Sequence, residues 1–75
     1  MIRYGKMTQS AIAAMSRLAE LYDGGARVSS LDIARTRNLP KPIVAKVLTV
    51  LSQGGLVTGA PGPTGGYRLA RPPRQ

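Results

Sequence analysis

The side chains of this sequence that can do chemistry are mostly cations. Eleven lysines and arginines stand against three acids, which gives a formal net charge of +8. The segment from residue 33 to residue 75 holds seven of these bases and no acid. A long stretch of one charge sign favours binding to a polyanion. We therefore expect nucleic acid as the partner, although a basic surface can also serve solubility alone.

Groups for catalysis or metal binding are scarce. The chain has no cysteine and no histidine, which excludes a disulfide, a thiolate nucleophile and a cysteine-bound metal within it. Glu20, Asp23 and Asp32 are expected on helix surfaces without a partner, with Asp32 in a capping role. The glycine-rich segment 61–66 joins two expected strands, so it is no phosphate loop. We expect no enzyme, no metal site and no small-molecule site.

Three amphipathic segments are predicted as helices, at residues 8–22, 30–37 and 41–53. In each of them apolar residues recur at three- and four-residue steps, which places them on one face. The residues expected in the core are Ile12, Met15, Leu18, Ala19 and Tyr22 in the first segment, Leu31, Ile33 and Ala34 in the second, and Val44, Val47, Leu48 and Leu51 in the third.

Cap and turn residues set the limits of these helices. Thr8 or Ser10 is expected to cap the first helix, and residues 29–32 (Ser-Ser-Leu-Asp) fit a capping box at the start of the second. Asn38 suits a left-handed residue that ends the second helix, with Leu39 packed under the turn. The second and third helices, separated by this tight turn, form a helix-turn-helix.

A short hairpin follows the third helix. Residues 56–58 and 67–69 are predicted as its strands, with Leu56, Tyr67 and Leu69 facing the helices. Glycine and proline supply the turn between the two strands. The hairpin therefore adds a small, basic wing to the helices.

The fold class is mainly α with a small β-hairpin: a winged helix-turn-helix of three helices plus a two-stranded wing. It occupies residues 1–71, and residues 72–75 form a disordered tail or a truncated linker. Residues 26–28 are expected as an extended link or a minor first strand.

A resemblance to a known family rests on residues 28–34 (VSSLDIA), 55–57 (GLV) and 62–71 (GPTGGYRLAR). The Gly-Gly-Tyr-x-Leu-Ala pattern that follows Gly-Leu-Val is its most specific part. On these residues the chain resembles the Rrf2 family of bacterial winged-helix transcription factors. The similarity covers nearly the whole chain.

The resemblance implies that the third helix enters the major groove of DNA and that the wing reaches the adjacent minor groove. It also implies a homodimer formed through a long helix after the winged domain. In several members three cysteines of that later region hold an iron–sulfur cluster. This chain contains neither feature. By resemblance it is the DNA-binding half alone, either a fragment or a reduced relative, without a cofactor of its own.

Some residues depart from the family pattern. Ala45 occupies a place where some members carry a base-reading glutamate, and Pro61 stands where the wing commonly has an arginine. Residues 7–10 replace a more basic opening, which leaves Lys6 as the nearest phosphate partner. The departures leave the expected fold intact, but no target sequence can be carried over from the family.

Candidate DNA contacts follow from position and chemistry. Lys46 lies mid-helix opposite the core, where it can reach a guanine or a phosphate, and Thr49 lies one turn further. Lys41 at the helix start suits a phosphate. Arg68 alternates with the core-facing Tyr67, so we expect it to point outward as a phosphate clamp. The full candidate set is Lys6, Thr8, Lys41, Ala45, Lys46, Thr49, Gly62, Thr64, Gly65 and Arg68.

The wing glycines have two explanations. Thr64, Gly65 and Gly66 can let the wing backbone come close to the sugar-phosphate chain, because glycine removes the side-chain obstacle. A tight hairpin that requires positive φ explains the glycines equally well. Both explanations stand at the level of sequence.

These patterns predict sequence-specific binding to duplex DNA by a transcriptional regulator, most simply a repressor in the bacterial cytoplasm. The alternative is a winged helix that docks a protein partner or another copy, because Ile43 and Val50 flank the buried stripe. Basic charge also allows RNA, but the absence of expected exposed aromatics argues against single strands. No stretch is long and apolar enough to span a bilayer, so no membrane is expected.

Overall fold

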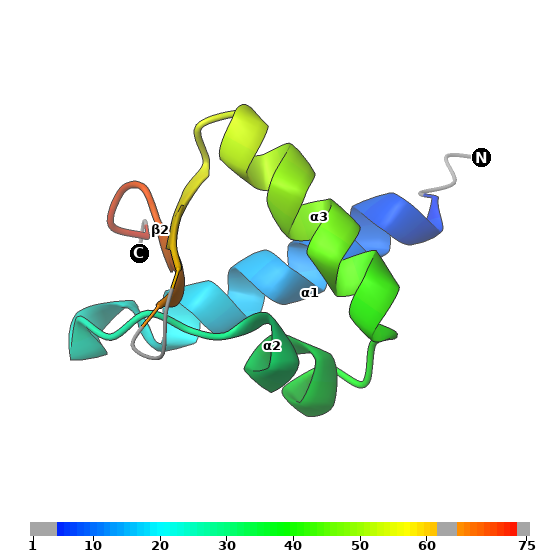
Figure 1. Ribbon diagram of the computed structural model, residues 1–75, viewed down its shortest axis with the longest axis horizontal. Coiled ribbons are helices and arrows are strands. Elements are labelled where there is room, and N and C mark those ends of the chain that lie inside the picture. The colour runs from blue at the N-terminus through cyan, green and yellow to red at the C-terminus, as the bar shows by residue number, and fades with distance from the viewer. Residues whose placement is uncertain (1–4, 62–64, 74–75) are drawn as a thin grey trace.

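The chain folds as three helices with a two-stranded antiparallel sheet, which confirms the winged helix-turn-helix (Figure 1). The computed structural model describes residues 5–61 and 65–73. Its elements are α1 (Lys6–Glu20), the 3-10 turn η1 (Tyr22–Gly24), α2 (Ser30–Thr36), α3 (Lys41–Gln53), β1 (Val57–Ala60) and β2 (Gly66–Leu69). Figure 1 shows α3 lying across α1, with the strands near the C-terminal end of α1.

The core lies where the three helices and the inner face of the sheet meet. The apolar stripe of α3 is buried as predicted, and the helix has the predicted bounds. Val57 and Leu69 close the core from the sheet. The largest fully buried side chains are Leu18, Ile33, Leu48, Val44 and Val47. Val28 pairs with Tyr67 in an isolated bridge, so the minor first strand expected at residues 26–28 is reduced to this one pair.

The start of α1 differs from the prediction. The helix begins at Lys6, with Gly5 as its N-cap and no side-chain capping bond. Neither Thr8 nor Ser10 therefore caps it; Thr8 is exposed, and Ser10 is buried in the second turn. Because the first four N–H groups of a helix need no side-chain partner when water reaches them, the chain extends the helix past the predicted cap.

The buried stripe of α1 also runs through different residues. Ile12, predicted in the core, is 59% exposed, whereas Ala14 is fully buried. Leu18 is buried as predicted, and Met15 and Ala19 pack partly buried against the core. A small alanine at the centre of the buried face allows close approach of a packed helix. Packing between the helices therefore buries a face of α1 that the spacing of the large apolar residues alone does not predict.

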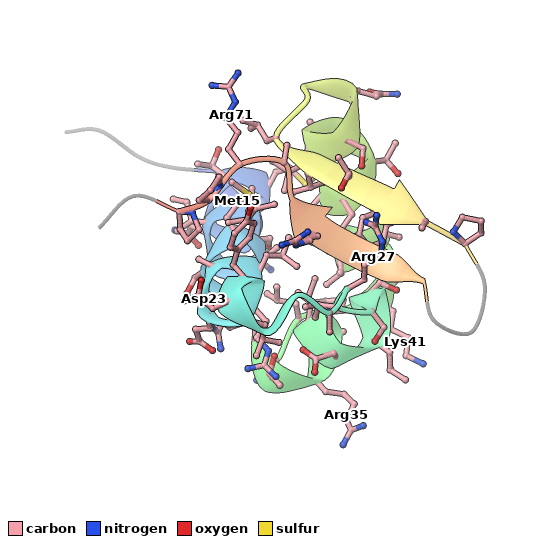
Figure 2. All side chains as sticks on the ribbon, turned by 90° about the vertical axis from the view of Figure 1, so that its left-hand side faces the viewer. Met15, Asp23, Arg27, Arg35, Lys41 and Arg71 are labelled. Atoms are coloured by element: carbon pink, nitrogen blue, oxygen red, sulfur yellow. The ribbon has the colours of Figure 1, made fainter. Side chains whose placement is uncertain are left out.

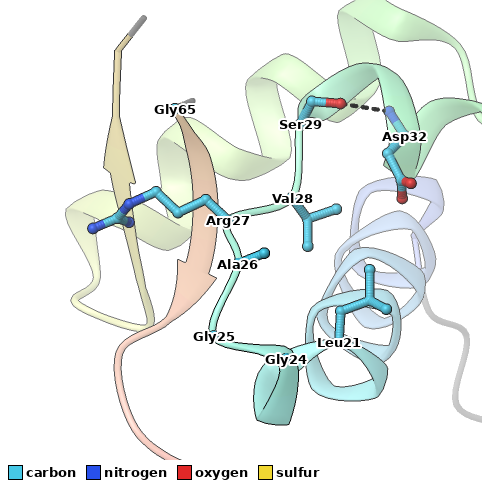
Figure 3. A pocket seen from close by; sticks show the side chains of 9 residues that line it. All are labelled: Leu21, Gly24, Gly25, Ala26, Arg27, Val28, Ser29, Asp32 and Gly65. Carbon is cyan, nitrogen blue, oxygen red and sulfur yellow. Dashed lines mark hydrogen bonds between the residues drawn. The ribbon is translucent and has the colours of Figure 1, made fainter. Parts of the chain in front are cut away.

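The start of α2 and the turn after it confirm most of the local signals. The predicted capping role of the Asp32 carboxylate is wrong, because this group accepts hydrogen bonds from Arg17 and, among the described residues, none from the Ser29 N–H. The Ser29 hydroxyl accepts a hydrogen bond from the Asp32 backbone N–H at 3.0 Å, which caps the helix (Figure 3). Asn38 has a φ of 53°, as a left-handed stop requires. Leu39 packs partly buried against the core. The turn that orients α3 against α2 is thus encoded by nearby residues.

Within α2 the predicted burial of Leu31 is wrong, because this side chain is 44% exposed. The helix has only seven residues and ends at Thr36, one residue before the predicted end. So short a helix offers one narrow face, which Ile33 and Ala34 occupy. Leu31 lies about 200° around the helix axis from Ile33 and therefore faces away from the core.

The first strand of the hairpin begins one residue later than predicted and ends two residues later. Val57 is 2% exposed, whereas Leu56 is 52% exposed and does not face the helices. Successive residues of a strand point to opposite sides, so a shift of one residue exchanges the two faces. The pairing joins Val57 to Leu69 and Gly59 to Tyr67. Leu69 is buried and Tyr67 packs against the core, as predicted.

The wing glycines have a structural cause. Gly66 has a φ of 128°, and a Cβ there would lie 2.8 Å from the Val28 carbonyl oxygen. A Cβ at Gly65 would collide with the backbone carbonyls of Ala60 and Pro61. Close backbone approach, to the Val28 link at Gly66 and within the hairpin at Gly65, therefore requires glycine at both positions, with or without DNA. The candidate contacts Gly62 and Thr64 lie outside the described residues.

Candidate nucleic-acid interface

The exposed face of α3 carries the main candidate contacts. Lys41, Ala45, Lys46 and Thr49 are all exposed. The Thr49 hydroxyl donates a hydrogen bond to the Ala45 carbonyl oxygen at 3.0 Å, so its proton is engaged within the helix. No acid lies on this helix. This face therefore presents the ammonium groups of Lys41 and Lys46, with the short side chains of Ala45 and Thr49 on the same exposed surface.

The start of α1 lies close to the start of α3. Lys6 is exposed and borders a surface hollow together with Asn38, Pro40 and Ile43. Lys41, the first residue of α3, follows Pro40 directly, and the helix has no side-chain cap there. Uncapped N–H groups and the helix dipole favour an anion at this end of α3. The structure thus brings two predicted phosphate partners, Lys6 and Lys41, to neighbouring positions.

Arg68 lies differently from the prediction. Its guanidinium stacks on the ring of Tyr22 at 4.6 Å from the ring centroid. The side chain is half-buried, and its Nε is buried without a hydrogen-bond partner among the described residues. The expectation that Arg68 points freely outward is therefore wrong, because η1 places Tyr22 over that part of the strand. Its role as a phosphate clamp stays a prediction, with less support.

A cation that the prediction omitted, Arg27, lies in the link between η1 and α2 and contacts the wing. It is exposed, and its Nη1 donates to the Thr58 carbonyl oxygen at 3.2 Å and to the Thr58 hydroxyl at 3.3 Å. Figure 3 shows Arg27 extending from the linker toward the strands, and Figure 2 labels it beside them. The alternation of an extended 26–28 link, with Val28 inward, could have indicated that Arg27 points outward.

Two other arginines are held by acids between α1 and α2. Arg17 pairs with Asp32 at 2.8 Å and with Glu20 at 3.1 Å, while Arg37 pairs with Glu20 at 2.7 Å. These bonds raise the pKa of Arg17 and lower the pKa of both carboxyls, chiefly through the hydrogen bonds to the arginines. The expectation that Glu20 and Asp32 lack partners is wrong. Within the described ranges, Lys6, Arg27, Arg35, Lys41, Lys46 and Arg71 make no ion pair.

The chain does not supply the ligands of an iron–sulfur cluster. It has no cysteine and no histidine. Over residues 5–61 and 65–73, no three acidic or other metal-ligating side chains come together. The donor set of this chain therefore fits neither a cluster nor an iron ion. In the same part of the chain, no helix has the length and apolarity needed to cross a membrane.

Known proteins are similar to this chain in both fold and sequence. The sequence profile of the Rrf2 family, described as iron-dependent transcriptional regulators, matches residues 4–75. The structure of IscR from T. potens is 33% identical with a TM-score of 0.86, covering 96% of this chain and 52% of that one. CymR, the global cysteine regulator of B. subtilis, is 29% identical with a TM-score of 0.90, covering 97% of this chain and 56% of that one.

A sequence relative from Aquifex aeolicus, described as an HTH-type transcriptional regulator, is 43% identical over 42 residues. That match covers 56% of this chain and 29% of the relative. The chain thus spans about half the length of the solved relatives and less of the curated one. The family and the Aquifex relative are described as transcriptional regulators and CymR as a global regulator, in agreement with the expectation that the chain is not an enzyme.

Proposed function

The chain belongs to the Rrf2 family of transcriptional regulators, and we propose that it binds duplex DNA sequence-specifically as the DNA-reading domain of such a regulator. The observation that carries the proposal is the exposed, acid-free face of α3, on which Lys41 and Lys46 have no ion pair among the described residues. In α1 and α2, Glu20 and Asp32 form ion pairs with Arg17 and Arg37. The unpaired cations are thereby left for an external anion.

In this proposal α3 enters the major groove. The helix is about 20 Å long and fits a groove about 12 Å wide. Lys46, in mid-helix, reaches base edges or a phosphate, while Lys41 and Lys6 hold phosphates at the uncapped helix starts. Arg27 supplies the charge of the wing, on the adjacent backbone or in the minor groove. Ala45 leaves room for close approach without reading a base.

We further propose that the regulator is a cytoplasmic repressor, since a bound domain occludes promoter DNA without any additional contact. One module reads one half-site, so the isolated chain should bind weakly, on the order of 10⁻⁶ M. A homodimer would join two half-sites and raise the affinity.

Titration of duplex DNA at several salt concentrations tests the proposal. Three neutralised phosphates, one each for Lys6, Arg27 and Lys41, give a log–log slope of roughly −2.7, and a phosphate contact by Lys46 brings the slope to roughly −3.6. Selection from a pool of mixed duplexes should enrich a common sequence, because Lys46 discriminates at base edges. An affinity that does not depend on salt concentration, or a duplex pool in which no sequence is enriched, contradicts the proposal.

One observation favours a second function, the docking of a protein partner. Val50 is 53% exposed on α3, and Ile43 on the same helix is half-buried. Exposed aliphatic side chains beside a buried stripe can extend an interface. A mass measurement that shows a defined complex with a protein, in a chain that shifts no duplex, would favour this function over DNA binding.

A further inference from the structure

A groove separates the C-terminal half of α3 from the wing. Thr49, Ser52 and Gln53 line it from the helix, and Gly59, Pro61 and Tyr67 line it from the strands. Its volume is about 490 Å³. None of these side chains is charged. The groove therefore differs from the N-terminal half of α3, where Lys41 and Lys46 stand.

The groove holds hydrogen-bond donors that are free among the described residues. Thr49 already donates to Ala45, but Ser52, Gln53 and Tyr67 make no side-chain hydrogen bond with any described residue. Ser52 and Gln53 are exposed, and Tyr67 is half-buried. Each can donate to an acceptor placed in the groove, and phosphate oxygens are acceptors only.

Gly59 fixes the place of the Tyr67 ring. A Cβ at Gly59 would lie 2.9 Å from Cε2 of that ring and 3.1 Å from Cδ2, so the ring lies directly against the glycine backbone. The backbone of Tyr67 is bonded on its other side to Val28, by two hydrogen bonds of 2.8 Å. The phenol is therefore held on a rigid element, as a binding group needs to be.

We propose that this groove seats a phosphodiester group of the DNA strand that passes between α3 and the wing. The inference rests on the proposed function: when α3 lies in a major groove and the wing in the adjacent minor groove, the backbone ridge between the two grooves lies between the two elements. That ridge meets the neutral donors Ser52, Gln53 and Tyr67. Contacts of this kind fix register and orientation but carry no sequence information.

Experiment can distinguish a phosphate contact made by neutral donors from one made by a lysine. Neutral donors do not neutralise phosphate charge and therefore release no counterions from the DNA. Their loss leaves the slope of log affinity against log salt concentration unchanged. Loss of a lysine contact reduces that slope by about one unit. The effect of a neutral phosphate contact is also the same for every duplex. These properties separate the groove from Lys41 and Lys46.

The test measures binding of the full chain to a duplex selected from a mixed pool and to an unrelated duplex, each at several salt concentrations. Tyr67→Phe removes only the phenol hydroxyl, and the double substitution Ser52→Ala with Gln53→Ala removes the helix donors. Each is expected to weaken binding to both duplexes roughly fivefold, with an unchanged salt slope. Lys41→Ala is the ionic control and should reduce the salt slope by about one unit. Lys46→Ala is the control for loss of a base-edge contact, and Ser16→Ala on α1 is the control for loss of an exposed hydroxyl elsewhere.

Three results overturn the inference. The first is unchanged affinity in the groove variants while Lys46→Ala weakens binding, which leaves the proposed function standing. The second is a loss confined to the selected duplex or accompanied by a smaller slope. The third is no duplex binding by the unmodified chain, which removes the proposed function as well. The helix variant alters exposed side chains only, so a folding defect in Tyr67→Phe would not obscure the outcome.

Discussion

The α1–α2 side of the molecule and the α3–wing side use the same kind of residue in opposite ways. On the first, Arg17 and Arg37 are bound by Glu20 and Asp32. On the second, Lys41, Lys46 and Arg27 make no ion pair among the described residues. The number of cations alone does not distinguish the two sides. Pairing does, because a cation already held by a carboxylate has little charge left for an external anion.

The largest expected effect comes from the unpaired side. Lys46→Ala should weaken binding to the preferred duplex by roughly 1–3 kcal/mol if the ammonium contacts a base edge. The free energy of unfolding should stay within about 0.5 kcal/mol, because the side chain is exposed. Fluorescence titration and thermal unfolding of the same preparations measure both quantities. Equal losses of stability and affinity would erase the distinction between the two sides.

The paired side should give the converse result. Arg17→Ala removes both of its ion pairs and leaves Asp32 without an arginine, so the midpoint of thermal unfolding should fall. Arg35→Ala, on the same helix as Asp32 (α2) but without an ion pair among the described residues, is the control and should change the midpoint less. Below the midpoint, DNA affinity and its salt slope should be close to those of the unmodified chain. A lower slope would show that Arg17 contacts DNA after all.

Lowering the pH should first weaken the ion pairs between α1 and α2 and so reduce the free energy of unfolding. Folding lowers the pKa of Glu20 and Asp32 from ordinary values of 4.5 and 3.8, through hydrogen bonds from Arg37 and Arg17. The stability that these carboxylates contribute is complete above those ordinary values, and it is lost as the pH falls through the lower folded values. Unfolding measured from pH 7 to pH 2 should show this decline, and Arg17→Ala should flatten it. Between pH 5 and pH 7 DNA binding should vary little, because the chain has no histidine.

The smallest effects decide to which side Arg68 belongs. Its stacking on Tyr22 resembles the structural use of Arg17, so Arg68→Ala and Tyr22→Leu should each cost about 0.5–1 kcal/mol of stability and show coupling in a double-mutant cycle. Arg27→Ala should instead reduce the salt slope of DNA binding by about one unit. A reduced slope for Arg68→Ala with unchanged stability would restore the sequence-based prediction of a phosphate clamp.

Prediction from sequence succeeded where the signal is local. The bounds and buried stripe of α3, the Ser29 cap and the left-handed Asn38 were all predicted, because each depends on residues within one or two helical turns. Ile12 and Leu56 were predicted on the wrong side. Their burial depends on how α1 rotates against α3 and on the register of β1, which residues distant in the chain decide.

The sequence by itself determined the fold class, the acid-free third helix and the caps of α2, since periodicity, capping and composition act over short distances. Only the tertiary structure decided which cations are free. Arg17 meets Asp32, Arg37 meets Glu20 and Arg68 meets Tyr22 because packing brings separate elements together. A charge count cannot reveal such pairings, because the energy of an ion pair depends on distance in space and not on position in the chain.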